Sequence, residues 1–536
     1  MYMSFKYIKH IVPVAALSLS LGLGSCVNDL DVAPIDPSTN MTPDYDALFT
    51  KCYANMALAG NTGPDGDCDI DGLDGGTTGF VRQLFNANEL TTDESICNWG
   101  DEGIPAFNFN QWGASHPMLK GFYYRLYFGV TMCNFYLSQA SDHDAAMTAE
   151  VRFLRALYYY HLMDCFGNIP FLTEVSPTAA QQADRKSVYN FIESELIGEN
   201  GCIAAMKAPK SNAYGRADQA AGWMLLARLY LNAEVYTGTA QWSKAAEYAK
   251  KVMESGYTLH KTGKGQWSAY QMLFMGDNGE NGAASEAILS LLQDGNTTAS
   301  YGTTLFLMAS TFKNDMELVG TSTNNVAGKQ WAGNRCRPDL VKKFFPNGGI
   351  PEDADTWAIL KAAKDDRALF WSKGRTLDID ETAVFEKGFS CTKFTNYYSD
   401  GGATHNSGFP DSDFFLMRAA EAWLTYAEAT ARQNGGITTA EGAAAINEIR
   451  TRANTTTKSS YSLNEILDEW AREFFFEGRR RVDLIRFGKF GGASDYKWQW
   501  KGGVKEGTNF SANLNVFAIP DTDLNANPNL VQNPGY

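Results

Sequence analysis

Helical segments occur in pairs along this chain, and each pair is joined by a short turn. Residues 216–233 and 242–255 carry apolar side chains at the spacing of an amphipathic helix, with Gly238 and Thr239 between them. Small residues on both segments would let the two helices approach closely: Ala221, Ala227, Ala245, Ala246 and Ala249. A helix, a turn and a helix in about 34 residues form a tetratricopeptide-like unit. The pattern predicts a mainly α fold whose helical pairs build a solenoid scaffold.

Three further regions show the same helical spacing. Apolar residues recur at three and four over residues 119–166, and Gly167 and Pro170 follow as stop signals. A second clear pair covers 414–452, with Phe414–Arg432 and Thr439–Arg452 as helices and Gly435-Gly436 as the turn. Residues 463–487 predict one more helix. We therefore expect helical pairs at about 119–166, 216–255 and 414–452.

Three long segments between these helices are of another kind. Residues 61–113, 296–351 and 389–410 are rich in Gly, Asn, Thr and aromatic residues and lack helical spacing. Loops of this length in a compact protein usually carry function. They predict one irregular, loop-rich face mounted on the helical scaffold.

The N-terminus has the pattern of a bacterial lipoprotein signal. Lys6 and Lys9 precede an apolar run over residues 11–23, and Leu23-Gly24-Ser25-Cys26 closes it. The run is shorter than the ~20 apolar residues of a membrane span. We expect cleavage of residues 1–25, acylation of Cys26, and one tethered body over residues 26–536. The alternative is an ordinary cleaved signal followed by a chance cysteine.

Charge and motif content exclude several function classes. The formal net charge is -15, and the one basic cluster, Arg479-Arg480-Arg481, lies beside acidic residues, so we expect ion pairs there and no nucleic-acid partner. The cysteines after Cys26 have no short paired spacing, which argues against a zinc site; Cys133 and Cys165 fall on apolar helical faces. No His-Glu-x-x-His, Gly-x-Ser-x-Gly or phosphate-loop motif is present. The 61 acidic residues leave a carboxylate pair for glycoside hydrolysis as an open alternative.

Five motifs in order resemble the starch-utilisation-system D family (SusD, also RagB), and together they cover nearly the whole chain after Cys26. They are residues 149–160 leading to Phe166-Gly167-Asn168-Ile169-Pro170, residues 215–231, 444–453 and 473–484, and the ending Asn529 to Tyr536. The resemblance implies a glycan-binding lipoprotein, anchored at the outer-membrane surface, that caps a SusC-type TonB-dependent transporter. The acidic start Asn28-Asp29-Leu30-Asp31 is similar to the surface-export signal of Bacteroidetes lipoproteins.

Within the family, the chain is most similar to the starch-binding archetype, which implies a starch-type alpha-glucan or maltooligosaccharide as ligand. Six residues match the archetype's site or lie in its motifs: Asp74, Arg82, Trp99, Asp101, Tyr301 and Trp331. Aromatic rings would stack on the apolar faces of sugar rings, and charged groups would hydrogen-bond the hydroxyls. Where the archetype has a second tryptophan, this chain has Cys97, so weaker starch binding or another glycan stays open. Burial under a loop is the alternative role for Trp99, Tyr301 and Trp331.

A calcium ion is a further hypothesis, and no other cofactor is expected. The loop Asp277-Asn278-Gly279-Glu280-Asn281 is similar to an oxygen-rich calcium site, which Asp411 and Asp413 could complete. A solvated turn is the alternative.

Overall fold

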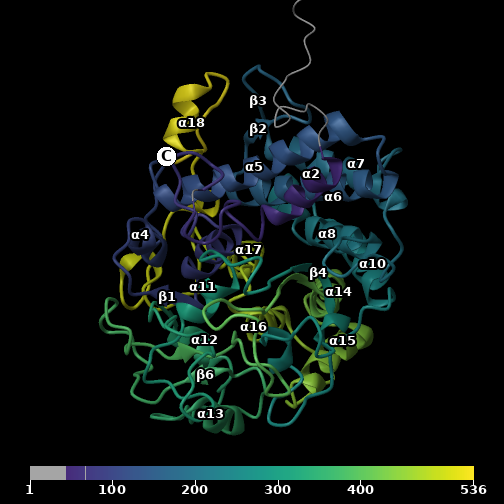
Figure 1. Cartoon of the computed structure of the whole chain (residues 1–536). Coiled ribbons are helices and arrows are strands. Elements are labelled where there is room, and N and C mark those ends of the chain that lie inside the picture. Colours follow the sequence, from purple (N-terminus) through teal and green to yellow (C-terminus); the bar gives the residue numbers. More distant parts are fainter. Residues whose placement is uncertain (1–43, 67) are drawn as a thin grey trace, which may run out of the picture. The chain divides into compact units, whose positions relative to one another are not determined.

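The computed structural model describes residues 44–66 and 68–536, and those from Tyr45 onward form one compact unit. The predicted signal segment and Cys26 lie outside the described residues. Longer helices dominate this unit (Figure 1): α2 (Tyr45–Ala54), α5 (Pro117–Ala140), α6 (Ala145–Phe166), α7 (Arg185–Ile197), α8 (Gln219–Leu231), α10 (Trp242–Met253), α13 (Thr356–Ala363), α14 (Ala419–Gln433), α15 (Ala440–Arg452) and α16 (Leu463–Phe474). In the part of the chain with described coordinates, none of the helices has the length and apolarity that a membrane crossing requires.

Short elements connect them. The shorter helices are α3 (Phe80–Phe85), α4 (Ile104–Phe109), α9 (Ala233–Thr237), α11 (Thr304–Ala309), α12 (Pro338–Lys342), α17 (Arg480–Arg486) and α18 (Asp521–Ala526). Within residues 44–66 and 68–536, strands pair antiparallel in four small sheets: β1 (Ser95–Cys97) with β5 (Asn334–Cys336), β2 (Ile169–Phe171) with β3 (Gln181–Ala183), β4 (Ala287–Leu291) with β8 (Phe414–Arg418), and β6 (Phe370–Trp371) with β7 (Ser390–Cys391). The predicted mainly α fold class is confirmed.

The helical pairs form because side-chain caps start the helices and small residues let them touch. Asp144 caps α6 and Asp218 caps α8, each accepting a hydrogen bond from a backbone N–H of the first turn. Helices α5 and α6 pack so closely that a Cβ added at Gly129 would lie 2.3 Å from the Tyr158 ring. Helices α8 and α10 also pack together, and Ala221, Ala227, Ala245 and Ala249 are buried, as their pattern predicts.

Two predicted helices begin or end differently from the expectation. Phe414–Arg418 was predicted as helix and is instead strand β8, paired with β4, and α14 begins only at Ala419. The predicted helix over residues 463–487 is broken into α16 and α17. Phe476 and Gly478 adopt positive φ values of 65° and 78° at the break. Glu89 Oε1 accepts hydrogen bonds from the N–H groups of Gly478 and Arg479, so a distant carboxylate satisfies donors that a continuous helix would use itself.

Buried ion pairs tie the helices to the strands. Arg418, at the end of β8, is fully buried and bonds Glu286 at 2.9 Å, Glu473 at 2.6 Å and Glu477 at 2.7 Å. The predicted ion pairs of the basic cluster are also present, because Arg480 bonds Asp93 and Arg481 bonds Asp164. Cys133 and Cys165, which fall on apolar helical faces, are both buried.

Candidate functional site

Strands β1 and β5 place two tryptophans side by side. Cys97 of β1 pairs with Asn334 of β5, so the segments that extend beyond this pair carry Trp99 and Trp331 to the same edge. The Trp99 indole N–H donates to the Trp331 carbonyl oxygen at 3.3 Å, and the two ring centroids lie 6.3 Å apart. Buried Arg337 fixes β1 from behind by donating to the Ser95 carbonyl oxygen at 2.8 Å.

The segment from Trp331 to Gly333 is shaped by its backbone. The Trp331 N–H donates to the Ala309 carbonyl at the end of α11, and the Gly333 N–H donates to the neighbouring Ser310 carbonyl, each at 2.7 Å. Ala332 lies between them with a φ of 51°. At Gly333 a Cβ would lie 2.3 Å from the Trp99 indole, so only glycine leaves room for this ring. The tryptophan pair therefore depends on a residue with no side chain.

Tyr301 stands at the other end of α11 and extends the aromatic row. Its ring lies 6.2 Å from Trp331 and 5.6 Å from Phe409, and its hydroxyl donates to Asp65 Oδ1 at 2.9 Å. The Lys329 ammonium lies 5.0 Å from the Tyr301 ring centroid, within the range of a cation–π contact.

The loops under Tyr301 meet backbone to backbone. A Cβ added at Gly79 would lie 2.8 Å from the Gly302 Cα, so glycine is needed for the close approach of residues 76–79 to the Tyr301 loop. The Arg82 N–H then donates to the Gly302 carbonyl at 3.0 Å, which joins the start of α3 to this loop.

Charged groups lie around the aromatic row. The Arg82 guanidinium packs 4.9 Å from the Phe306 ring and 5.6 Å from the Trp99 ring. Burial lowers the pKa of Arg82, and the nearby charges of Asp101 and Asp74 act in the opposite direction. Asp74 accepts a hydrogen bond from the Thr77 N–H at 2.7 Å, and both it and Asp101 are exposed.

These side chains surround one depression that is open to solvent and has a volume of about 600 Å³. All six residues predicted from the sequence line it: Asp74, Arg82, Trp99, Asp101, Tyr301 and Trp331. Trp99, Tyr301 and Trp331 are half-buried, so the alternative of complete burial under a loop does not apply. Asp65 and Thr77 also line the depression and were missed. Their position in the predicted loop segment 61–113 was the only available signal.

Comparison with known proteins identifies the family. The model described as "SusD family" matches residues 360–536, and the one described as "Starch-binding associating with outer membrane" matches residues 85–249. "Starch-binding protein SusD" of Bacteroides thetaiotaomicron is 40% identical over an alignment of 572 positions, which covers 100% of both chains. The chain belongs to the SusD family. The resemblance expected from the five motifs is confirmed.

A further relative and two solved structures are similar to this chain at lower identity. "SusD-like protein P2" of Formosa agariphila is 25% identical, over 82% of this chain and 86% of its own length. A SusD superfamily protein from Parabacteroides distasonis has a TM-score of 0.66 at 20% identity, over 92% of this chain and 98% of that one. The structure of a "Laminarin binding SusD-like protein" has a TM-score of 0.64 at 21% identity, and the match covers 92% of this chain and 99% of that one.

Cys97 does not line the depression of this SusD family member. Its side chain is 2% exposed, and burial raises the pKa of its thiol to about 12. Its backbone N–H and carbonyl both bond the amide group of Asn108. The residue that departs from the archetype is therefore part of the core behind Trp99.

The acids predicted for calcium each accept hydrogen bonds from the protein itself. Asp277 accepts from Asn281 and Ser399, Asp413 from the Gln293 N–H and Tyr214, and Asp411 from the Gly295 N–H and Tyr398. Within the described residues, the His, Cys, Asp and Glu side chains close enough to share a metal are Asp294, His405 and Asp411. Of the residues predicted to bind calcium, only Asp411 belongs to this group. The calcium site therefore stays a prediction.

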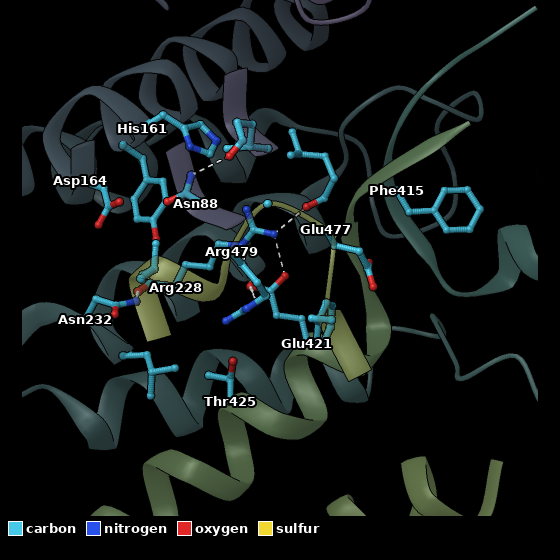
Figure 2. Close-up of a pocket in the computed structure, with 17 residues that line it drawn as sticks. Asn88, His161, Asp164, Arg228, Asn232, Phe415, Glu421, Thr425, Glu477 and Arg479 are labelled. Atoms are coloured by element: carbon cyan, nitrogen blue, oxygen red, sulfur yellow. Dashed lines mark hydrogen bonds and ion pairs between the residues drawn. The ribbon is translucent and has the colours of Figure 1, made fainter. Parts of the chain in front are cut away.

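A second cavity of this family member is far smaller. Figure 2 shows its buried polar lining, in which Arg228 bonds Glu421 at 2.6 Å and Arg479 bonds the same carboxylate at 3.0 Å. Burial lowers the pKa of His161 to about 3, so its ring is neutral at physiological pH, as a packing residue would be. The volume of about 50 Å³ admits a few water molecules and no sugar ring. This cavity belongs to the core.

Proposed function

We propose that this protein binds a starch-type alpha-glucan or maltooligosaccharide in the depression lined by Trp99, Tyr301 and Trp331. The observation that carries the proposal is the convergence of these rings, from segments more than 200 residues apart, on one open surface of suitable size. Trp99 and Trp331 are inclined by 55° and Trp331 and Tyr301 by 50°. A row of rings that turns at each step suits a glucan that coils rather than one that runs straight.

Polar groups at the rim would fix the glucan in place. Arg82 offers donors to sugar hydroxyls, and Asp65, Asp74 and Asp101 offer acceptors. The full-length relative named as starch-binding supports the same ligand class.

Binding without hydrolysis is the activity that this arrangement favours. A glycosidase requires a carboxylic acid whose pKa is raised by an apolar environment. Among the described residues, the carboxylates that line the depression are those of Asp65, Asp74 and Asp101, and each of them is exposed to solvent.

A different glycan is the second candidate. It is left open by Cys97, which stands in the core at the position where the resemblance to the archetype implies a second tryptophan. The test is titration of the purified protein with maltoheptaose, a cyclodextrin, laminarin and other polysaccharides. Saturable binding of both glucans without release of reducing ends supports the proposal. If only another polysaccharide binds, that glycan replaces starch as the proposed ligand. If reducing ends are released, the protein is an enzyme.

At the cell, we propose that Cys26 anchors the protein by its lipid to the outer surface of the outer membrane, where it delivers glucan to a SusC-type TonB-dependent transporter. The family model that describes association with the outer membrane supports this location. A Cys26→Ser variant should leave the membrane fraction, and the native protein should co-purify with a transporter of that type. A Cys26→Ser variant that stays membrane-bound would contradict the anchor.

We also propose a structural calcium ion at Asp277, Asn281, Asp411 and Asp413, whose carboxylates would have to move closer together to share it, because the described group within reach of one ion is Asp294, His405 and Asp411. Carboxylate and amide oxygens are the ligands that this ion prefers. Addition of calcium after treatment with a chelator should raise the melting temperature, and an Asp277→Asn variant should lose that response. An equal response in the variant would place the ion elsewhere.

A further inference from the structure

A third pocket, distinct from the glycan-binding depression and from the small core cavity, lies between α5, the loop from β2 to β3, and α18. These elements are at the top of Figure 1. Its volume is about 270 Å³, and its lining includes Tyr123, Tyr124, Tyr127 and Tyr159. None of its lining residues belongs to the glycan-binding depression. A ligand of this pocket would therefore bind independently of the glycan.

The tyrosine hydroxyls are already used by the protein, so the pocket offers mainly their rings. Tyr127 donates to the Pro170 carbonyl and Tyr159 to the Leu172 carbonyl, each at 2.6 Å. Tyr124 bonds Thr522 at 2.7 Å. The Tyr123 and Tyr127 rings lie 4.7 Å apart with planes inclined by 57°. Tyr124 and Tyr127 remain half-buried and can present an edge or face to a ligand.

The charge of this pocket is negative and unbalanced. Asp523 and Glu174 line it, whereas no lysine or arginine is found among its described lining residues. Tyr123 donates to Asp523 Oδ2, which leaves Oδ1 for a ligand. Burial raises the pKa of the Asp523 carboxyl, because the charged form is poorly solvated there. A bound cation would stabilise that charged form. Arg155 contacts the pocket residue Asn134, but its own charge is paired with Glu195 at 2.5 Å.

Exposed apolar side chains beside the pocket indicate a protein rather than a free small molecule. Val175, in the pocket loop, is 57% exposed, and Val531 is 71% exposed. Val531 is held against β3 by two hydrogen bonds to the Gln182 side chain, at 3.0 and 2.9 Å. Apolar side chains on a surface next to a lined pocket are typical of protein interfaces.

We propose that this pocket receives an arginine side chain from a protein partner whose neighbouring apolar residues cover Val175 and Val531. A guanidinium is planar and weakly hydrated, so it can stack on Tyr124 and Tyr127 while it bonds the carboxylates of Asp523 and Glu174. Arginine in an aromatic-lined pocket is also a frequent anchor of protein interfaces.

The test uses the purified full-length protein and two peptides, acetyl-Leu-Arg-Leu-amide and the same peptide with citrulline in place of arginine. Citrulline keeps the shape of the side chain and removes its charge. Saturation-transfer NMR should show saturable binding of the arginine peptide and binding at least about tenfold weaker for the citrulline peptide. Asp523→Asn should weaken the arginine peptide about tenfold, whereas Asp521→Asn, an exposed change on the same helix, should leave it unchanged.

Maltoheptaose binding and the melting temperature serve as controls for folding. If Asp523→Asn lowers the melting temperature, the exposed Glu174→Gln variant decides in its place. The proposal is overturned by equal affinity for the two peptides, by no saturable binding of the arginine peptide, or by a folded Asp523 or Glu174 variant that binds as tightly as the native protein.

Discussion

Gly333 offers a test of the binding site that removes no aromatic ring. In Gly333→Ala the new Cβ would lie 2.3 Å from Trp99 Cε2, whereas ordinary contact begins at 3.4 Å, so the indole must move by about 1.1 Å. This shift breaks the hydrogen bond from the Trp99 N–H to Trp331 and tilts the ring out of the row. A hydrogen bond of this kind stabilises the position of the ring by about 0.5–1.5 kcal/mol, and the displaced ring also stacks less well on the sugar. We therefore expect the binding of maltoheptaose to be about tenfold weaker.

The assay is calorimetric titration of the native protein, Gly333→Ala and the control Gly100→Ala. Gly100 lies next to Trp99, and a Cβ there would meet nothing within 4 Å, so the control should bind as the native protein does. In a Trp99→Ala background the Gly333→Ala change should have no further effect, because the ring that it displaces is gone. An unchanged affinity in Gly333→Ala, or an equal loss in Gly100→Ala, would show that the position of the Trp99 ring does not depend on Gly333.

Three further predictions concern charge. Arg418→Ala removes the buried cation that Glu286, Glu473 and Glu477 share, although Arg452 still pairs with Glu286 and Glu473 and Lys393 still pairs with Glu477. Because a buried charge loses its compensation, urea denaturation should show about 3–5 kcal/mol lower stability, and a loss below about 1 kcal/mol would contradict the role of this network. Burial and the charge of Glu89 raise the pKa of Glu94 well above its usual range, so its contribution to stability is full below about pH 4 and falls as pH rises towards the folded pKa. Glu94→Gln should therefore gain stability relative to the native protein between pH 5 and pH 8, and melting curves with a constant difference over that range would disprove this assignment. Maltoheptaose is neutral, so its affinity should change less than about twofold between 50 and 500 mM NaCl, whereas a steep salt dependence would indicate an ionic ligand.

The helices could be predicted where local signals agree with the tertiary structure. Caps such as Asp144 and Asp218 and the spacing of apolar residues mark their starts and faces. The strand Phe414–Arg418 could not be distinguished from a helix, because a short apolar run fits both and its partner β4 is more than 100 residues away. The break after α16 depends on Glu89, 389 residues before Gly478, which no local pattern can reveal.

The same limit applies to the site. The six predicted residues came from the family resemblance, since periodicity assigns no role to a tryptophan in a glycine-rich loop. Asp65 was missed because its role depends on a contact with Tyr301, 236 residues later. Gly333 was missed for a similar reason, since its importance appears only when the Trp99 ring is seen against it.

The affinities of the native protein and of Trp331→Ala for maltoheptaose, measured under identical conditions, decide whether the glucan binds in this depression. Trp331 is the middle ring of the row, in contact range of both Trp99 and Tyr301. Removal of a central aromatic anchor costs about 2 kcal/mol or more, so the dissociation constant should rise at least about thirtyfold while the melting temperature stays the same. Native binding that is retained in a folded Trp331→Ala protein would place the glucan somewhere other than this depression.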